Sequence, residues 1–139
     1  MSKLNAGVIS FDRYEVNEVR FKLNPNYVDE EVNISINLES NFQVEDSGNL
    51  LVAQLFLTVF PEAERMGFPF EMYLALTGYF TKSREAEDIK TFEANAMAIL
   101  FPYVRAIVST YTASANVTPL ILPTINTSKF LNNSRTKKI

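Results

Sequence analysis

The chain has 139 residues, of which 47% are hydrophobic and 21% are charged, and it contains no cysteine, histidine or tryptophan. This length and composition predict a single globular domain over residues 1–139, with flexible tails at about 1–10 and 132–139. The absence of cysteine excludes disulfides and thiolate metal sites, and it fits a reducing, cytoplasmic setting. Without histidine or cysteine, the commonest general base and the thiol nucleophile are missing. We therefore expect a protein that is not an enzyme, with no cofactor and no metal.

Charge is distributed unevenly along the chain. Residues 1–93 hold all 16 acidic residues and 8 of the 13 basic ones, a net charge of −8, whereas the later residues carry only basic groups. The acidic front part argues against a nucleic-acid partner, and a basic end is typical of a solvated tail. The apolar run 96–115 contains Arg105 and many hydroxyl side chains, which favours a buried helix over membrane insertion. Charge returns too early, at Asp12 and Arg13, for an export signal.

Two alternating patterns in the first third of the chain predict strands. From residue 32 to residue 44, apolar side chains occupy one parity and polar side chains the other, as in a half-buried strand. Within residues 14–23 the alternation slips once, around Asn17 and Glu18, which predicts a β-bulge. The Asn-Pro-Asn sequence at residues 24–26 then ends this first strand.

Residues 50–60 and 68–80 are apolar on both faces, which is typical of central strands. The connections between strands are short, and short connections favour antiparallel neighbours. We therefore predict an α+β fold that opens with a four-stranded antiparallel sheet arranged as a meander.

A long helix is predicted from about residue 85 to residue 111. Its section 96–108 is apolar nearly all round, and such a helix has to be covered on more than one side. One sheet covers only one side, so the pattern predicts oligomerisation. Pro102 removes a main-chain N–H, which is expected to kink the helix or split it in two. Beyond Asn116, the prolines at 119 and 123 predict an extended apolar segment, followed by a short helix at 127–133.

Aromatic residues are frequent, with eleven Phe and six Tyr. Most are expected in the core, and the rest are available to line a groove for partners of varied sequence. Carboxylate pairs such as Glu30 with Glu31 fall in predicted connections, where solvated surface is the simpler interpretation. No residue stands out as catalytic.

The stretch LFPYVRAIVSTYTASANVTPLILPTIN, residues 100–126, resembles the SecB family of export chaperones. In that family, a helix with a Leu-Phe-Pro-Tyr-x-Arg core is followed by an apolar segment bounded by prolines, an Asn and a short final helix. Residues 100–105 match the first part, and Leu122, Pro123, Ile125 and Asn126 match the second. The early Asn-Pro-Asn break and the Gly-Tyr-Phe sequence at 78–80 occur in the family's order, so the resemblance extends along the chain.

The resemblance implies a homotetramer, built as a dimer of dimers, that acts without ATP. Such a protein holds unfolded or precursor polypeptides in hydrophobic grooves in the cytoplasm and keeps them competent for translocation. Loss of water from apolar surface would drive this binding, at roughly 25 cal/mol per Å². The groove residues implied in this sequence are Tyr27, Val28, Phe42, Tyr103, Tyr111, Leu120, Ile121, Leu122 and Phe130.

The sequence departs from the family pattern at three points. Thr127 follows the Asn where the family has Phe, so Phe130 is the substitute candidate. The family docks to the motor SecA through acidic residues, for which Glu15, Glu18 and Glu71 are the candidates here. Lys22, however, occupies a position where an acid is expected, and the chain ends with the basic sequence SRTKKI.

Two alternatives to a general export chaperone therefore stay open. One is a SecB-like oligomer dedicated to a single client such as an antitoxin. The other is a structural or interaction protein without general chaperone activity, in which the apolar segment after Asn116 is simply core.

Overall fold

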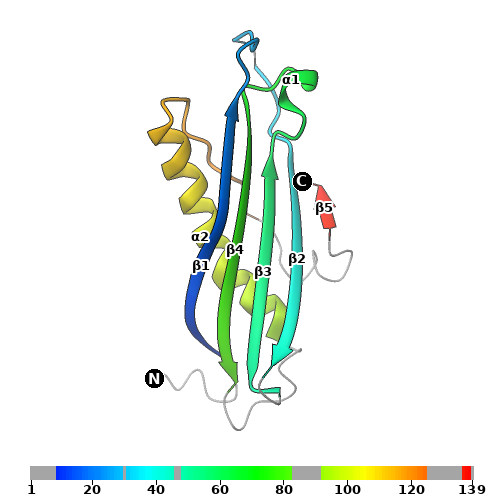
Figure 1. Cartoon of the computed structure of the whole chain (residues 1–139), viewed down its shortest axis with the longest axis vertical. Coiled ribbons are helices and arrows are strands. Elements are labelled where there is room, and N and C mark those ends of the chain that lie inside the picture. The colour runs from blue at the N-terminus through cyan, green and yellow to red at the C-terminus, as the bar shows by residue number, and fades with distance from the viewer. Residues whose placement is uncertain (1–8, 30, 46–47, 83–91, 125–135, 139) are drawn as a thin grey trace.

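The computed structural model describes residues 9–29, 31–45, 48–82, 92–124 and 136–138 (Figure 1). Within these residues the chain forms five strands and two helices. Their order is β1 (Ile9–Leu23), β2 (Ile36–Glu45), β3 (Leu50–Val59), α1 (Ala63–Met66), β4 (Phe70–Lys82), α2 (Glu93–Ser114) and β5 (Thr136–Lys138).

The strands form one antiparallel sheet in the order β1-β4-β3-β2-β5. The predicted four-stranded antiparallel sheet followed by a helix is confirmed, and β3 and β4, apolar on both faces, are central as expected. The meander is correct only for β2, β3 and β4, because β1 pairs with β4 and not with β2. The connection between β1 and β2, residues 24–35, is too long for a tight turn and carries the chain across the end of the sheet (Figure 1).

Two β-bulges interrupt the pairing of β1 with β4, at Phe11/Arg13 and at Val16/Glu18. The second is the predicted bulge, and the first was not predicted. The extra residue of each bulge, Asp12 or Asn17, is polar and accepts a side-chain hydrogen bond from a nearby threonine of β4. Thr77 donates a 2.6 Å hydrogen bond to Asn17, and Thr81 donates one to Asp12. These side-chain bonds fix the register of an edge strand that is mostly exposed.

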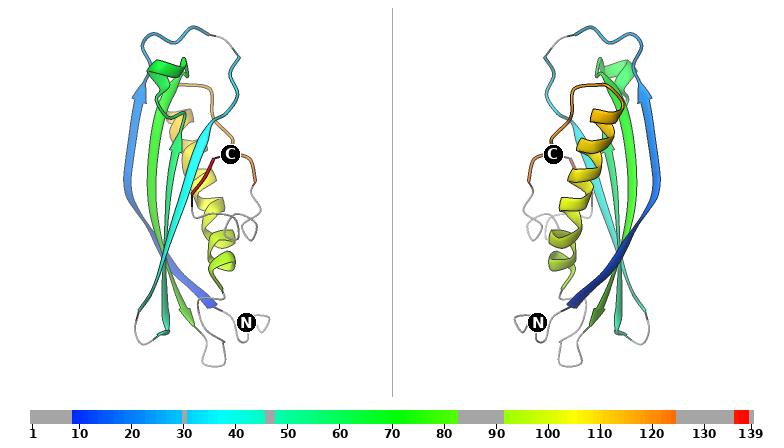
Figure 2. Two further views of the ribbon diagram at one scale, coloured as in Figure 1. Left: turned by 90° about the vertical axis from the view of Figure 1, so that its right-hand side faces the viewer. Right: turned by 90° about the vertical axis from the view of Figure 1, so that its left-hand side faces the viewer.

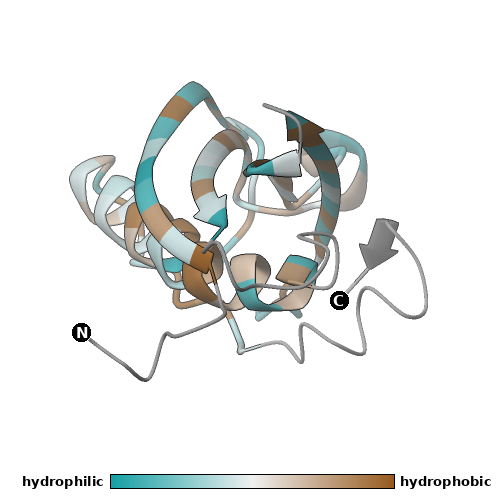
Figure 3. Ribbon diagram, turned by 90° about the horizontal axis from the view of Figure 1, so that it is seen from below, coloured by the Kyte–Doolittle hydropathy of each residue, from teal (hydrophilic) through white to brown (hydrophobic). Residues whose placement is uncertain are grey.

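Helix α2 packs on one face of the sheet, so the domain has two layers (Figure 2). Residues alternate between the two faces along the strands, visible as bands of hydrophilic and hydrophobic colour in Figure 3. The side chains of the inner face meet the buried side of the helix, and the core includes Leu38, Leu55, Leu74, Leu76, Phe80, Met97, Leu100, Val104 and Val108.

Helix α2 runs as one helix from Glu93 to Ser114, so Pro102 does not split it in two. Pro102 is exposed, whereas Phe101 and Val104 are buried and belong to the core that α2 forms with the sheet. By length and mean hydropathy α2 also resembles a membrane span. Its packing on the sheet is that of the core helix of a folded domain.

Three predictions for the back half of the chain concern segments that lie partly or wholly outside the residues that the structure describes. The predicted start of the long helix at residue 85 and the predicted short helix at 127–133 lie outside the described residues. The tail 132–139 was expected to be flexible, but Thr136–Lys138 forms β5 and pairs with β2. Strand pairing along an edge needs only main-chain groups, so the polar side chains of the tail gave no sign of it.

Candidate functional site

Residues 117–124, here called the strap, follow α2 and run back along it without regular secondary structure. Polar side chains of the helix hold the main chain of the strap. Ser109 Oγ donates a 2.9 Å hydrogen bond to the carbonyl oxygen of Leu120, whose own N–H donates to Thr112 Oγ1, also at 2.9 Å. Arg105 Nε donates to the carbonyl oxygen of Leu122 at 3.1 Å.

The spacing of these three helix residues, i, i+4 and i+7, places them on one face of α2. The hydroxyl and guanidinium groups that interrupt an otherwise apolar helix therefore have a defined task. They form hydrogen bonds with main-chain groups of the strap, which cannot be helical because of its prolines.

The strap presents its side chains alternately. Leu122 is 1% exposed and belongs to the core, and Ile121 is 69% exposed. Leu120 is half-buried, so its exposure is intermediate. The three residues predicted together as groove wall therefore occupy three different environments.

Asn24 holds the other side of the site, the connection between β1 and β2. Its side chain is buried and donates to the carbonyl oxygens of Phe68 at 2.9 Å and Ala63 at 3.3 Å. Its Oδ1 accepts a 2.9 Å bond from the N–H of Asn26. The Asn-Pro-Asn sequence thus forms an Asx turn that fixes the connection to the segment between β3 and β4.

A groove of about 510 Å³ lies between this connection and the strap. We call it the strap groove. Its polar members are Asn24, Asp29, Asn116 and Thr118. Its walls and floor are mainly apolar and are formed by Leu23, Tyr27, Val32, Ile34, Phe60, Pro69, Phe70, Val117, Pro119 and Leu120.

Aromatic rings form the floor of the strap groove and continue beyond it. Phe60 and Phe70 are buried and meet edge to face, with ring centroids 5.2 Å apart. Phe21 stacks on Phe70 at 5.0 Å and contacts Tyr111 of α2 at 5.5 Å. The groove floor therefore joins the side of the helix through a continuous aromatic series.

A second apolar surface lies on α2 beside β1, and we call it the helix-face patch. It forms a shallow hollow of about 310 Å³ lined by Tyr14, Tyr103, Ala106, Ile107, Thr110, Tyr111 and Ser114. The rings of Tyr14 and Tyr103 lie 4.6 Å apart, and Tyr103 and Tyr111 are each more than a third exposed. This surface is the uncovered side of the helix that the sequence predicted to need a partner.

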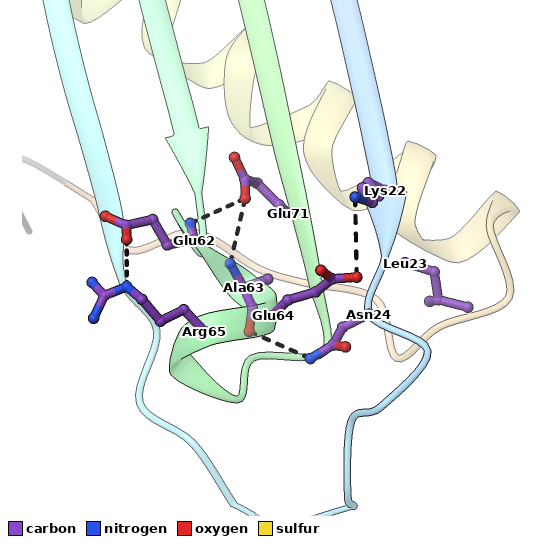
Figure 4. A pocket seen from close by; sticks show the side chains of 8 residues that line it. All are labelled: Lys22, Leu23, Asn24, Glu62, Ala63, Glu64, Arg65 and Glu71. Carbon is purple, nitrogen blue, oxygen red and sulfur yellow. Dashed lines mark hydrogen bonds and ion pairs between the residues drawn. The ribbon is translucent and has the colours of Figure 1, made fainter.

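A third hollow, of about 270 Å³, lies where α1 meets β1 and β4, and it is lined by charged residues (Figure 4). Glu71 accepts hydrogen bonds from the N–H groups of Glu62 and Ala63. Arg65 pairs with Glu62 at 2.6 Å, and the hydrogen bond and charge of that carboxylate raise the pKa of Arg65. Among the described residues, no three acidic side chains gather as metal ligands would.

The sequence profile of the SecB family, described as preprotein translocase subunit SecB, matches residues 9–138. The chain belongs to the SecB family. This match covers nearly all the residues described above and agrees with the sheet-plus-helix fold.

Comparison with individual proteins supports the assignment. The chain is 33% identical over 129 residues to the uncharacterized protein MJ0357 of Methanocaldococcus jannaschii, covering 90% of this chain and 83% of that one. Its fold resembles that of the Mycobacterium tuberculosis Rv1957 SecB-like chaperone, solved with a ChAD peptide from the Rv1956 HigA1 antitoxin. That match has a TM-score of 0.62 at 12% identity and covers 85% of this chain and 91% of the other. A Streptococcus agalactiae protein of unknown function matches with a TM-score of 0.54 at 15% identity, over 84% and 97% of the two chains.

The structure of this SecB-family chain divides the predicted groove residues among several places. Tyr27 and Leu120 meet in the strap groove, and Tyr103 and Tyr111 meet in the helix-face patch. Phe42 lies half-buried on the inner face of β2, away from both. Val28 is 68% exposed beside Tyr27. Phe130 lies outside the described residues.

Sequence reasoning missed Val32 and Ile34 as groove residues. Their alternation was assigned to the second strand, which begins only at Ile36. The length of the connection between β1 and β2 could have indicated their role. A connection that crosses the end of the sheet can turn apolar residues toward the strap.

The three carboxylates predicted to dock SecA lie on the outer face of the sheet or at its end. Glu15 pairs with Arg13 at 2.8 Å and accepts a 3.0 Å hydrogen bond from Tyr79. Glu18 pairs with Arg20 at 2.8 Å. Glu71 accepts main-chain N–H groups, as described above. Each carboxylate is thus already engaged within this SecB-family chain.

Proposed function

We propose that the chain is an ATP-independent holdase that binds non-native polypeptide segments in the strap groove and keeps them unfolded. The observation that carries the proposal is an apolar groove whose walls come from two extended connections. Leu23, 54% exposed, and Ile34, 41% exposed, leave apolar surface open at this site. Covering such surface gains roughly 25 cal/mol per Å², so binding requires neither nucleotide hydrolysis nor catalytic chemistry.

The construction of the groove favours clients of varied sequence. Its floor of Phe60 and Phe70 is buried in the core, whereas its walls are irregular segments anchored at a few points, by Asn24 on one side and by α2 on the other. Aromatic and aliphatic surface accepts many side chains, because its contacts do not depend on direction as hydrogen bonds do.

The helix-face patch supports assembly into a homotetramer, a dimer of dimers. Tyr103 and Tyr111 are exposed on an apolar helix, and the neighbouring Val16 of β1 is 46% exposed. β1 also forms one edge of the sheet in the described part of the chain. Exposed apolar surface of this kind is typical of subunit interfaces.

A second candidate is a chaperone dedicated to one client, such as an antitoxin, working without SecA. The observation that favours it is the engagement of Glu15 with Arg13 and Tyr79, and of Glu18 with Arg20. A basic docking partner would have to compete with these internal partners. The M. tuberculosis SecB-like chaperone, whose structure was solved in complex with an antitoxin peptide, provides a precedent.

The absence of tryptophan allows a direct test, because all indole fluorescence then comes from the client. The chain is titrated into a tryptophan-containing polypeptide held unfolded, with fluorescence anisotropy as the signal and the same polypeptide folded as the control. Binding of several unfolded polypeptides supports a general holdase, and binding of one among many supports the dedicated form. If no unfolded polypeptide binds, the proposal is wrong.

A further inference from the structure

Residues Thr136–Lys138 return to the sheet and extend it by one strand. They form β5, which pairs antiparallel with β2 in the register Asn37 with Lys138, Leu38 with Lys137 and Glu39 with Thr136. Figure 1 shows β5 beside β2, at the end of the sheet opposite β1. The chain therefore covers part of its own sheet edge.

The edge of β2 is longer than the strand that covers it. β2 spans ten residues, Ile36–Glu45, and its pairing with β5 ends at Glu39. Beyond that point, among the described residues, β2 has a strand partner only on the β3 side. Main-chain N–H and C=O groups on such an edge accept any extended polypeptide, whatever its side chains, by strand addition.

The charges of the two segments are complementary in the sequence. The tail carries Arg135, Lys137 and Lys138, whereas β2 carries Glu39 and Glu45 and belongs to the acidic part of the chain. Attraction between a basic tail and an acidic body favours docking at low salt and weakens as the ionic strength rises.

We infer that β5 is a built-in competitor that occupies the strand-addition edge of β2 and is displaced by an extended segment of a client. That a client displaces β5 rests on the proposed holdase function, whereas the docking of β5 on β2 does not. Because the tail is tethered, it competes at an effective concentration that no free tripeptide reaches. In the described part of the tail it pairs with three residues of β2, and a client segment that pairs with more of β2 displaces it. The device thus selects long extended segments over short apolar ones.

Two matched variants separate strand pairing from charge. Lys137→Pro with Lys138→Pro removes two charges and two main-chain N–H donors, whereas Lys137→Gln with Lys138→Gln removes the same charges and keeps the donors. Successive residues of a strand direct their N–H groups to opposite sides, so the proline pair removes a donor toward β2 in either register. Neither residue belongs to the strap groove.

Two measurements decide the inference. In hydrogen exchange, the proline pair is expected to speed exchange of β2 amides within residues 37–39 relative to the glutamine pair. In the anisotropy titration, the proline pair is expected to bind the unfolded tryptophan-containing polypeptide about threefold to tenfold more tightly than the glutamine pair. Equal exchange in the two variants overturns the inference, and so does equal affinity. If neither variant binds the polypeptide, the proposed holdase function is wrong. Faster exchange in the proline pair would in that case still show that β5 docks on β2, although no client displaces it.

Discussion

Gly78 of β4 lies directly beneath Leu100 of α2, so close that a Cβ atom at position 78 would be 2.6 Å from Leu100 Cδ2 and 3.0 Å from Cγ. Leu100 is fully buried and belongs to the hydrophobic core, so its side chain has to shift within the core to accept an added methyl group. The glycine therefore sets the distance between helix and sheet. This explains on physical grounds a glycine in the middle of a central strand, where it is otherwise unfavourable.

Replacing Gly78 with Ala is expected to lower the free energy of unfolding by about 1–3 kcal/mol, because the added methyl group overpacks the contact with Leu100. Urea denaturation of the variant measures this loss. The same substitution in a Leu100→Ala background serves as the control, since the space opened there should remove most of the additional cost. An equal cost in both backgrounds would show that the contact is not the cause.

Thr112 makes a second testable contribution, as the buried acceptor for the N–H of Leu120. Thr112→Val keeps the volume of the side chain but leaves that N–H without its acceptor, at an expected cost of about 1–3 kcal/mol. Thr124→Val, on an exposed position of the strap, is the matched control and should change stability by less than about 0.5 kcal/mol. Thermal denaturation measures the stability of both variants. If both lose the same stability, Thr112 is not a hydrogen-bond acceptor that stabilises the strap.

The sequence predicted those parts of the fold that depend on local periodicity. The alternation in β2, the apolar faces of β3 and β4 and the bulge beside Asn17 all follow from the spacing of apolar residues, and each is found. The pairing of β1 with β4 was not predictable in this way. It depends on the path of a twelve-residue connection, which periodicity does not describe.

The site was only partly predictable, for a related reason. The strap was identified from its prolines, but the side to which each of its residues points depends on hydrogen bonds from Arg105, Ser109 and Thr112. These three residues looked like interruptions of an apolar helix. Strand β5 was missed because main-chain pairing leaves no signature in polar side chains.

The helix-face patch gives a prediction about assembly. Tyr103→Glu places a charge on its exposed surface and is expected to dissociate the oligomer into smaller species while the isolated fold persists. Gln43→Glu adds the same charge at an exposed position of β2 and should leave the assembly unchanged. Light scattering coupled to gel filtration at micromolar concentration measures both masses. A Tyr103→Glu protein with the parent mass would exclude this patch as an interface.

Neighbouring residues of the strap separate client binding from stability. Ile121→Ser alters a side chain that is 69% exposed, so it should weaken binding of an unfolded polypeptide while changing the unfolding free energy by less than about 0.5 kcal/mol. Leu122→Ser removes a core side chain that is 1% exposed and should cost several kcal/mol, about 2–5 by analogy with other large-to-small core changes.

The contrast between the two variants is the decisive result, because they lie one residue apart in the same segment. Client affinity from anisotropy and stability from urea denaturation are measured on each. If Ile121→Ser binds clients as the parent does, the exposed side of the strap does not contribute to binding. The strap would then contribute to client binding only through the residues that line the strap groove, Val117, Pro119 and Leu120.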